Sequence, residues 1–271
     1  MKIDLINDVH LEFGTYRPSN PNGSRVLVIS GDVIPIARLK NDKKNGEYRK
    51  FFERCSDLYE EVVYVYGNHE FYGSDIHLAR EEAKERLAYL ENVRILDNEA
   101  FRLDDVVFLG GTMWTDCNRE DPMTMMSLSH SMNDFNLIKN RLNDSYTYGP
   151  KGLFTPTDSV REHKEFKLFL SRALYEYCEE KCVVVTHHSP TWMSVPDDYR
   201  YDREMNGGYV SALEEFISFR PQIKVWTYGH THEPKKMRIG DTVLMNNARG
   251  YVGHERYSDD VEPYLPLTFE V

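Results

Sequence analysis

Residues 62–73 read V-V-Y-V-Y-G-N-H-E-F-Y-G, an apolar run that gives way to an amide, an imidazole and a carboxylate. β-Branched and aromatic residues of this kind predict a buried strand over residues 62–66. The polar group Gly67-Asn68-His69-Glu70 then follows at the carboxyl end of that strand. In α/β sheets, ligands bind at the carboxyl ends of strands. This stretch therefore predicts an α/β sheet whose edge carries a functional site.

The same succession of apolar strand and polar cluster occurs four more times. The other clusters are Asp8-Val9-His10, Gly31-Asp32, Thr186-His187-His188 and Gly229-His230-Thr231-His232. Side chains two apart at the end of an extended strand point to one side, so the two ends of D-x-H and of H-x-H can each reach one ion. Glycine in three of the five clusters permits a sharp exit from the strand. We expect all five clusters to meet at one rim.

The chemistry of these side chains is that of a metal site. Imidazole nitrogens with carboxylate and amide oxygens suit divalent ions such as Mn, Fe, Zn, Ni or Mg. Any single cluster is weak evidence, and His187 alone is more often a hydrogen-bonded core histidine than a ligand. Six of the ten histidines, however, fall in these clusters at strand ends, beside Asp32 and Asn68. The joint pattern favours a metal centre.

Length and composition limit the remaining choices. The 271 residues fit a single domain over 1–271. A formal net charge of -11 repels nucleic acid and anionic lipid at long range, although bound cations would offset it locally. There is no apolar run of about 20 residues, no leader pattern, and no C-x-x-C pair among the four cysteines. We therefore expect a cytoplasmic protein without a membrane partner.

Other segments fill in the α/β pattern. Further strands are predicted at residues 3–6, 26–29, 106–109, 183–185, 224–228, 243–246 and 267–270, and amphipathic helices at 74–91 and 159–178. Two capping boxes are expected, Ser159-x-x-Glu162 and Ser211-x-x-Glu214. The segment 112–156, which we call the cap segment, is rich in Met, Asn, Asp and Ser and is longer than an ordinary connection. It is either a cap over the site or a surface insertion.

The five clusters, in this order, resemble the calcineurin-like metallophosphoesterase signature D-x-H, G-D, G-N-H-[ED], H and G-H-x-H, and the resemblance spans Asp8 to His232. It implies a four-layer α/β/β/α sandwich of two mixed sheets flanked by helices. It also implies a phosphate-ester hydrolase that activates water between two divalent metal ions, among which Mn is favoured.

Residue roles follow from the same resemblance. One ion would be held by Asp8, His10, Asp32 and His232, and the other by Asp32, Asn68, His187 and His230, so that Asp32 bridges the two. His69 would contact the phosphate and protonate the leaving oxygen, and Glu70 would orient His69.

A narrower resemblance, to a bacterial and phage-type subgroup, involves Gly111-Thr112-Met113-Trp114-Thr115-Asp116, Met132-Asn133-Asp134-Phe135 and Arg249-Gly250-Tyr251. The residues expected to bind substrate are Asn68, Asn133, Asp134, His188 and Arg249. The alternative for Asn133 and Asp134 is a turn cap or a surface pair. Gly31-Asp32-Val33-Ile34-Pro35 lacks the acidic-Arg-Gly of protein serine/threonine phosphatases, which makes that activity less expected.

Three functions compete at this point. The favoured one is hydrolysis of a small phosphodiester or nucleotide-type substrate. The second is a nuclease or a nucleic-acid end-processing phosphatase, for which Lys40, Lys43 and Lys44 form only a short basic cluster and not a stripe. The third is a non-catalytic scaffold that keeps the fold, although every matched position is retained here. The oligomeric state stays open.

Overall fold

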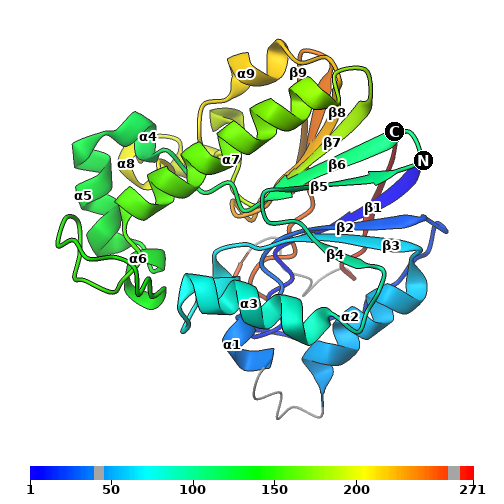
Figure 1. Ribbon diagram of the computed structural model, residues 1–271, viewed down its shortest axis with the longest axis horizontal. Helices are drawn as coiled ribbons and strands as arrows, with labels where there is room; N and C mark the ends of the chain where they lie inside the picture. Colours follow the sequence, from blue (N-terminus) through cyan, green and yellow to red (C-terminus); the bar gives the residue numbers. More distant parts are fainter. Residues whose placement is uncertain (40–45, 256–262) are drawn as a thin grey trace.

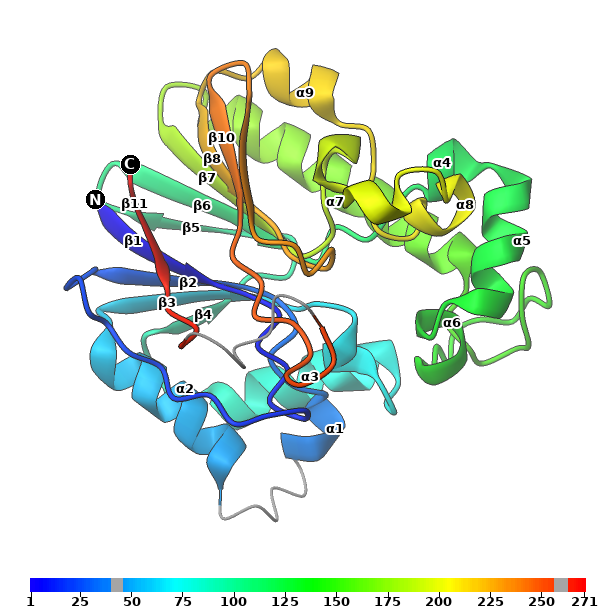
Figure 2. The same cartoon turned by 180° about the vertical axis from the view of Figure 1, so that it is seen from behind.

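Two β-sheets lie face to face at the centre of the structure, a computed structural model that describes every residue except 40–45 and 256–262 (Figure 1). The first sheet has the order β11-β1-β2-β3-β4. Its strands are β1 (Lys2–Ile6), β2 (Val26–Ser30), β3 (Glu61–Val65), β4 (Val93–Ile95) and β11 (Leu267–Glu270). β11 pairs antiparallel with β1, and the other neighbours are parallel. Figure 2 shows β11 beside β1, and the amino group of Met1 lies 2.6 Å from the carbonyl of Val271.

The second sheet has the order β5-β6-β7-β8-β10-β9. Its strands are β5 (Glu99–Leu103), β6 (Val106–Gly111), β7 (Lys181–Thr186), β8 (Ile223–Thr227), β9 (Lys235–Ile239) and β10 (Thr242–Asn246). The two outer pairs, β5 with β6 and β10 with β9, are antiparallel, whereas the inner pairs are parallel. Both sheets are therefore mixed, as predicted, and each predicted strand matches an observed one to within two residues at either end.

Helices cover the outer face of each sheet. Below the first sheet lie α1 (Ile36–Leu39), α2 (Glu47–Leu58) and α3 (Ile76–Leu87), and above the second lie α7 (Pro156–Glu176) and α9 (Glu214–Ser218) (Figure 1). Three apolar clusters fill the spaces between the four layers: one under the first sheet, one over the second, and one between the sheets. The middle cluster joins residues such as Val28 and Val63 of the first sheet to Phe108 and Val183 of the second. This is the expected four-layer sandwich.

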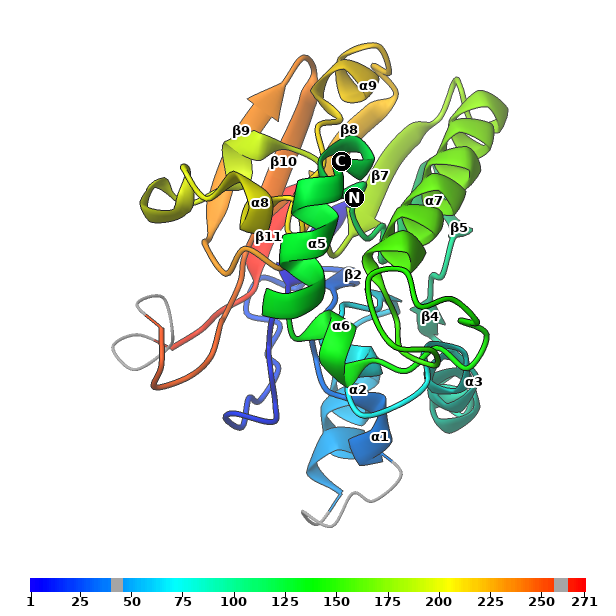
Figure 3. The ribbon, with the colours of Figure 1, turned by 90° about the vertical axis from the view of Figure 1, so that its left-hand side faces the viewer.

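The cap segment lies to one side of the sheets, where Figure 3 shows its helices in front of them. It contains α4 (Cys117–Glu120), α5 (Pro122–Ser131) and α6 (Asp134–Leu137). In α4 the backbone is left-handed, with φ between 48° and 62°. The short α8 (Arg203–Asn206) packs against α5, and single 3-10 turns occur at His69–Phe71 (η1), Trp192–Ser194 (η2) and Asp197–Tyr199 (η3). Aromatic contacts join the segment to the core, since the ring of Trp114 stacks on that of Phe71 with centroids 6.0 Å apart.

Both predicted capping boxes are wrong. α7 begins three residues earlier than expected, because Thr155 and Asp158 form the capping box and Pro156 supplies a pre-set φ for the first turn. The Ser159 hydroxyl donates to the carbonyl of Thr115 instead. α9 begins at Glu214 itself, and Ser211 accepts a hydrogen bond from the Asp116 backbone. Each hydroxyl thus joins the cap segment to a neighbour.

Two further expectations concern the length of α3 and the basic cluster of lysines. α3 is shorter than the predicted 74–91, because Asp75 caps it by accepting from the N–H groups of His77 and Leu78. The basic cluster Lys40, Lys43 and Lys44 lies outside the described residues. Among the residues that the structure describes, no helix is both long and apolar enough to cross a membrane.

The attachment of the cap segment generates a stability prediction. Phe154 of the cap segment is fully buried in the apolar cluster that lies under the first sheet, so Phe154→Ala should lower the free energy of unfolding by about 3–5 kcal/mol. Tyr146→Ala, in the same segment but at a side chain that is 76% exposed, should change it by less than about 0.5 kcal/mol. Urea unfolding of the two variants checks this. Equal losses would show that Phe154 does not anchor the segment.

Candidate metal centre

The five polar clusters meet at one rim, where β1, β2 and β3 of the first sheet end beside β7 and β8 of the second. The site residues that they contribute are Asp8, His10, Asp32, Asn68, His69, His187, His230 and His232. Of these, all but His232 are at least nine-tenths buried. The convergence predicted from the strand ends is therefore confirmed.

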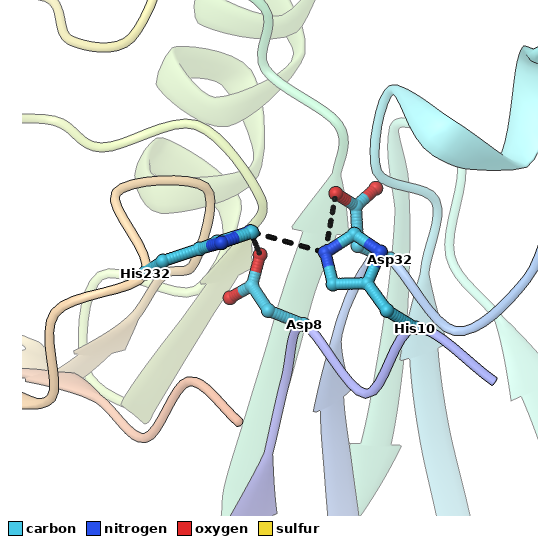
Figure 4. A group of neighbouring side chains, drawn as sticks. All are labelled: Asp8, His10, Asp32 and His232. Carbon is cyan, nitrogen blue, oxygen red and sulfur yellow. Dashed lines mark hydrogen bonds and ion pairs between the residues drawn. The ribbon is translucent and has the colours of Figure 1, made fainter. Parts of the chain in front are cut away.

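One group of ligand-type atoms lies on the β1 side (Figure 4). His10 Nε2 is 3.0 Å from His232 Nε2 and 3.5 Å from Asp32 Oδ2. His232 Nε2 is also 3.3 Å from Asp8 Oδ1. These four residues each offer one atom within 4.8 Å of the others, which is the spacing needed to surround a single ion.

A second group lies beside the first and shares Asp32 with it. His187 Nε2 is 3.4 Å from Asp32 Oδ2, 3.0 Å from Asn68 Oδ1 and 3.2 Å from His230 Nδ1. Asp32, His187 and His230 meet the same spacing criterion as the first group. Asp32 Oδ2 thus stands between His10 on one side and His187 on the other.

The unused bonding capacity of these atoms fits two cations. Asp32 Oδ2 and His230 Nε2 are buried yet have no hydrogen-bond partner in the part of the chain that the structure describes. Burial alone would raise the pKa values of Asp8 and Asp32, but neighbouring imidazoles, chiefly His232 for Asp8 and His187 for Asp32, outweigh it and lower both pKa values. Divalent metals bind ionised carboxylates and imidazole nitrogens that are not already hydrogen-bonded. The donor set therefore fits the dinuclear centre that the resemblance implied.

The backbone around these residues is unusual. Asp8, His10, Asp32, His230 and His232 all have positive φ, between 46° and 67°. Such conformations cost free energy in residues other than glycine and cluster at functional sites. Two glycines make the approach possible: a Cβ on Gly67 would collide with the Asp32 carboxylate, and one on Gly31 would lie 2.6 Å from His187 Nδ1. These glycines were predicted to let the chain leave the strands sharply. The structure shows that they also allow neighbouring loops to approach each other closely.

Glu70 does not orient His69, and this expectation is wrong. Its carboxylate accepts hydrogen bonds from the backbone N–H groups of Asp32, Val33 and Gly67 and from the Tyr64 hydroxyl, at 2.7 to 3.0 Å. Burial, with the nearby charge of Asp32, raises the pKa of Glu70 to about 7. Glu70 therefore ties the loop after β2 to the loop after β3 and lies behind the site.

Glu12 takes the place beside His69 that Glu70 was expected to fill. Its Oε1 lies 2.9 Å from His69 Nδ1 and 3.3 Å from His10 Nδ1. On the other side of the ring, His69 Nε2 is 3.0 Å from the Tyr251 hydroxyl. Burial opposes protonation of His69, but Asp32 and Glu12 outweigh it and raise the pKa of the imidazole. The ring is thus held at both nitrogens.

A cavity of about 360 Å³ opens over the two groups. The site contributes Asn68, His69, His230 and His232 to its wall. The cap segment contributes residues 131–134, the segment 195–209 contributes Tyr199 and Tyr209 among others, and a third wall holds Tyr251 and Glu255. Asn133 and Asp134 therefore line the cavity, as the subgroup resemblance suggested.

Two other expected substrate contacts are wrong. The guanidinium of Arg249 donates to the carbonyls of Val9, Gly14 and Thr15, and the side chain is 2% exposed and outside the cavity wall. His188 is buried behind His230, with Nδ1 3.3 Å from the carbonyl of Thr112. Arg249 fixes the loop after Asp8, and His188 packs in the core.

Three residues of the site escaped the sequence interpretation: Glu12, Tyr251 as a partner of His69, and Glu255. A signal existed for Glu12, because it continues the every-second-residue pattern of Asp8 and His10. Glu255 lies 2.8 Å from His232 Nδ1 and also accepts from the Tyr251 backbone. It is 23 residues from His232, and no local pattern marks it.

Comparisons with known proteins agree with this fold. The chain is 25% identical to an uncharacterised protein of Acanthamoeba polyphaga mimivirus over 260 residues, which is 92% of this chain and 86% of that protein. Its fold is similar to that of phosphopantetheinyl hydrolase from Mycobacterium tuberculosis, with a TM-score of 0.66, 14% identity, and coverage of 92% and 89% of the two chains. A dimetal phosphatase from Danio rerio is similar at a TM-score of 0.52, with 13% identity and coverage of 92% and 87%.

A family model decides the assignment, since the model of the calcineurin-like phosphoesterases matches residues 1–234 and so contains every cluster described above. The chain belongs to the calcineurin-like phosphoesterase family of metal-dependent phosphate-ester hydrolases.

Proposed function

We propose that this protein hydrolyses a small phosphodiester or nucleotide-type substrate with the help of two divalent ions held at the rim. The observation that carries the proposal is the position of Asp32 Oδ2. It is buried, has no hydrogen-bond partner outside the undescribed residues 40–45 and 256–262, and lies 3.5 Å and 3.4 Å from the nitrogens of two separate ligand-type groups. A carboxylate oxygen in that position is suited to bridging two cations.

The ligand assignment follows the two groups. Asp8, His10, Asp32 and His232 would hold one ion, and Asp32, Asn68, His187 and His230 the other. When bound, such a pair of ions neutralises phosphate charge and makes a water nucleophile available near neutral pH. Nitrogen and oxygen ligands without a thiolate suit Mn, Fe, Zn, Ni or Mg, and among these we favour Mn on the family resemblance.

The protein's own contribution to proton transfer centres on His69. Its Nε2 faces the cavity, where it can donate a proton to the oxygen of the departing group. The Glu12 carboxylate accepts at Nδ1, which fixes the ring orientation and favours the protonated imidazole. The Tyr251 hydroxyl contacts Nε2 and would give up this contact to the substrate.

The cavity supports a small substrate with an aromatic or sugar-like portion. The Tyr209 ring stacks on His230 with centroids 4.5 Å apart, and the Tyr72 ring stacks on His69 at 4.2 Å. The described wall residues include three carboxylates, Asp134, Asp202 and Glu255, and no lysine or arginine. A nuclease needs a basic track for a long phosphate backbone, so nucleic acid remains the less favoured substrate.

The cellular setting is part of the same proposal. All four cysteines are free thiols, which suits a reducing compartment such as the cytoplasm. The partner is a small phosphorylated molecule and not a membrane.

Metal removal tests the proposal directly. Chelator-treated protein should not turn over bis-p-nitrophenyl phosphate, and Mn²⁺ should restore turnover. Because the ions bind only the folded chain, Mn²⁺ at 100 times its Kd should stabilise the fold by about 2.7 kcal/mol for each site. Asp32→Asn should lose both effects. Full activity after complete metal removal would refute the proposal, and preference for single-stranded DNA over the small diester would favour the nuclease alternative.

A second prediction concerns His69. His69→Ala should lower kcat by about 10²–10⁴-fold, because proton donation to the leaving oxygen is lost, while bound Mn per chain stays at the wild-type value. The matched control is His130→Ala on α5, whose exposed ring hydrogen-bonds to Met126 and Ser129 of the same helix. Loss of metal together with activity in His69→Ala would contradict the assigned role.

A third prediction separates the two glutamates. Glu12→Gln should lower kcat by about 10-fold or more at saturating Mn²⁺, because His69 and His10 lose the carboxylate that orients them. Glu70→Gln should instead lower the free energy of unfolding of the metal-free protein by about 1–3 kcal/mol, since an amide cannot accept from all of the backbone donors. Turnover assays and urea unfolding on both variants give the answer. The reverse pattern would restore Glu70 as the partner of His69.

A further inference from the structure

The Asn68 carboxamide is held at both ends. Its Oδ1 faces the second group of ligands, 3.0 Å from His187 Nε2. Its Nδ2 donates to Asp134 Oδ1 at 2.7 Å and to the Tyr72 hydroxyl at 3.1 Å. The Tyr72 hydroxyl donates in turn to the same Asp134 oxygen at 2.6 Å. Amide, phenol and carboxylate therefore form a closed network.

The orientation of this amide decides whether Asn68 can bind a metal. A carboxamide has one oxygen that can accept or ligate and one NH₂ group that can only donate. Rotation by 180° would turn the NH₂ group towards His187 and the metal position, where it could ligate nothing. An ionised carboxylate accepts but does not donate, so it pairs with the NH₂ group and opposes the rotated form.

We propose that Asp134, supplied by the cap segment, is a positioning residue of the metal centre that keeps the Asn68 oxygen directed at the second ion. This inference rests on the proposed function, since it concerns the same pair of ions. It assigns to the cap segment a part in metal binding as well as in lining the cavity.

Backbone hydrogen bonds to the segment that follows Asn68 fix the location of Asp134. The backbone of Gly73 donates to the carbonyl of Leu137 at 3.0 Å, and that of Lys139 donates to the carbonyl of Ser74 at 2.9 Å. These bonds join the segment after η1 to the end of α6. Asp134 is 1% exposed, so its contacts with Asn68 and Tyr72 are protected from competing water.

The test compares metal affinities of the full chain. Metal-free wild-type protein, Asp134→Asn and Asp144→Asn are titrated with Mn²⁺ by calorimetry. Asp144→Asn is the control because it makes the same change of charge in the cap segment. The Asp144 side chain is 91% exposed and pairs with Lys151. We expect two tight sites in the wild type and in Asp144→Asn, whereas Asp134→Asn should keep one and bind the second ion about 10–100-fold more weakly.

A double variant supplies the rescue. In Asn68→Asp with Asp134→Asn, the ligand is a carboxylate with two equivalent oxygens, so no amide orientation has to be enforced. The second affinity should return towards the wild-type value. The single variant Asn68→Asp places two carboxylates side by side, and we expect its affinity for the second ion to stay below the wild-type value.

The outcomes distinguish the inference from the function on which it rests. If Asp134→Asn lowers thermal stability but leaves both affinities unchanged, Asp134 is only structural and the inference fails. Failure of the double variant to recover the second affinity would also overturn it. If the wild type binds two ions and hydrolyses no phosphate ester, the proposed function fails while the positioning role stands. A wild type that binds no Mn²⁺ would refute both.

Discussion

Two buried carboxylates set the main constraint on this structure. Asp8 and Asp32 stand at the ends of neighbouring strands with at most 1% of their surface exposed. Burying an ionised carboxylate costs several kcal/mol unless opposite charge and hydrogen bonds compensate for it. Here the compensation comes from imidazoles on loops of both sheets, while Asp32 Oδ2 has no hydrogen-bond partner among the described residues. The fold must therefore bring distant loops to one point and leave room there for cations.

The sandwich meets this constraint by fixing the strands before the loops. The apolar cluster between the sheets holds β1 and β2 against β7 and β8, so the ends of these strands have little freedom. The loops then take strained, left-handed conformations at Asp8 and Asp32, with φ of 50° and 55°. Glu70 and Arg249 stabilise them by hydrogen bonding to the loop backbone. Glu70, expected to orient His69, and Arg249, expected to bind substrate, thus both stabilise the loops that carry the ligands.

Sequence patterns predicted the parts of the structure that depend on local order. Strands show as apolar runs, and the ligand clusters follow them directly. None of the predicted helices corresponds to α2, although its apolar residues recur at helical spacing and would have allowed the prediction. These residues are Tyr48, Phe51, Phe52 and Cys55. β5 was not predictable in this way, because this edge strand is mostly exposed and has no apolar run. Glu70 was misassigned because adjacency in sequence says nothing about direction: the Glu70 carboxylate accepts from the backbone of Gly67, whereas the His69 ring pairs with Glu12.

Metal ligands and cavity walls come from different parts of the chain. The geometry of the metal centre and the fit of the substrate are therefore determined by different residues. The ligands lie on short loops rooted in the sheets, so the position of the ions is set by the core. The walls come from the cap segment, from the segment 195–209 and from Tyr251 with Glu255, which lie outside the sheets. Substitutions in those walls can change which substrate fits without displacing the ions. Asp134 and Glu255 are the exceptions, because each lines the cavity and also bonds to an expected ligand, Asn68 or His232. At these two positions, substrate fit and metal geometry are coupled.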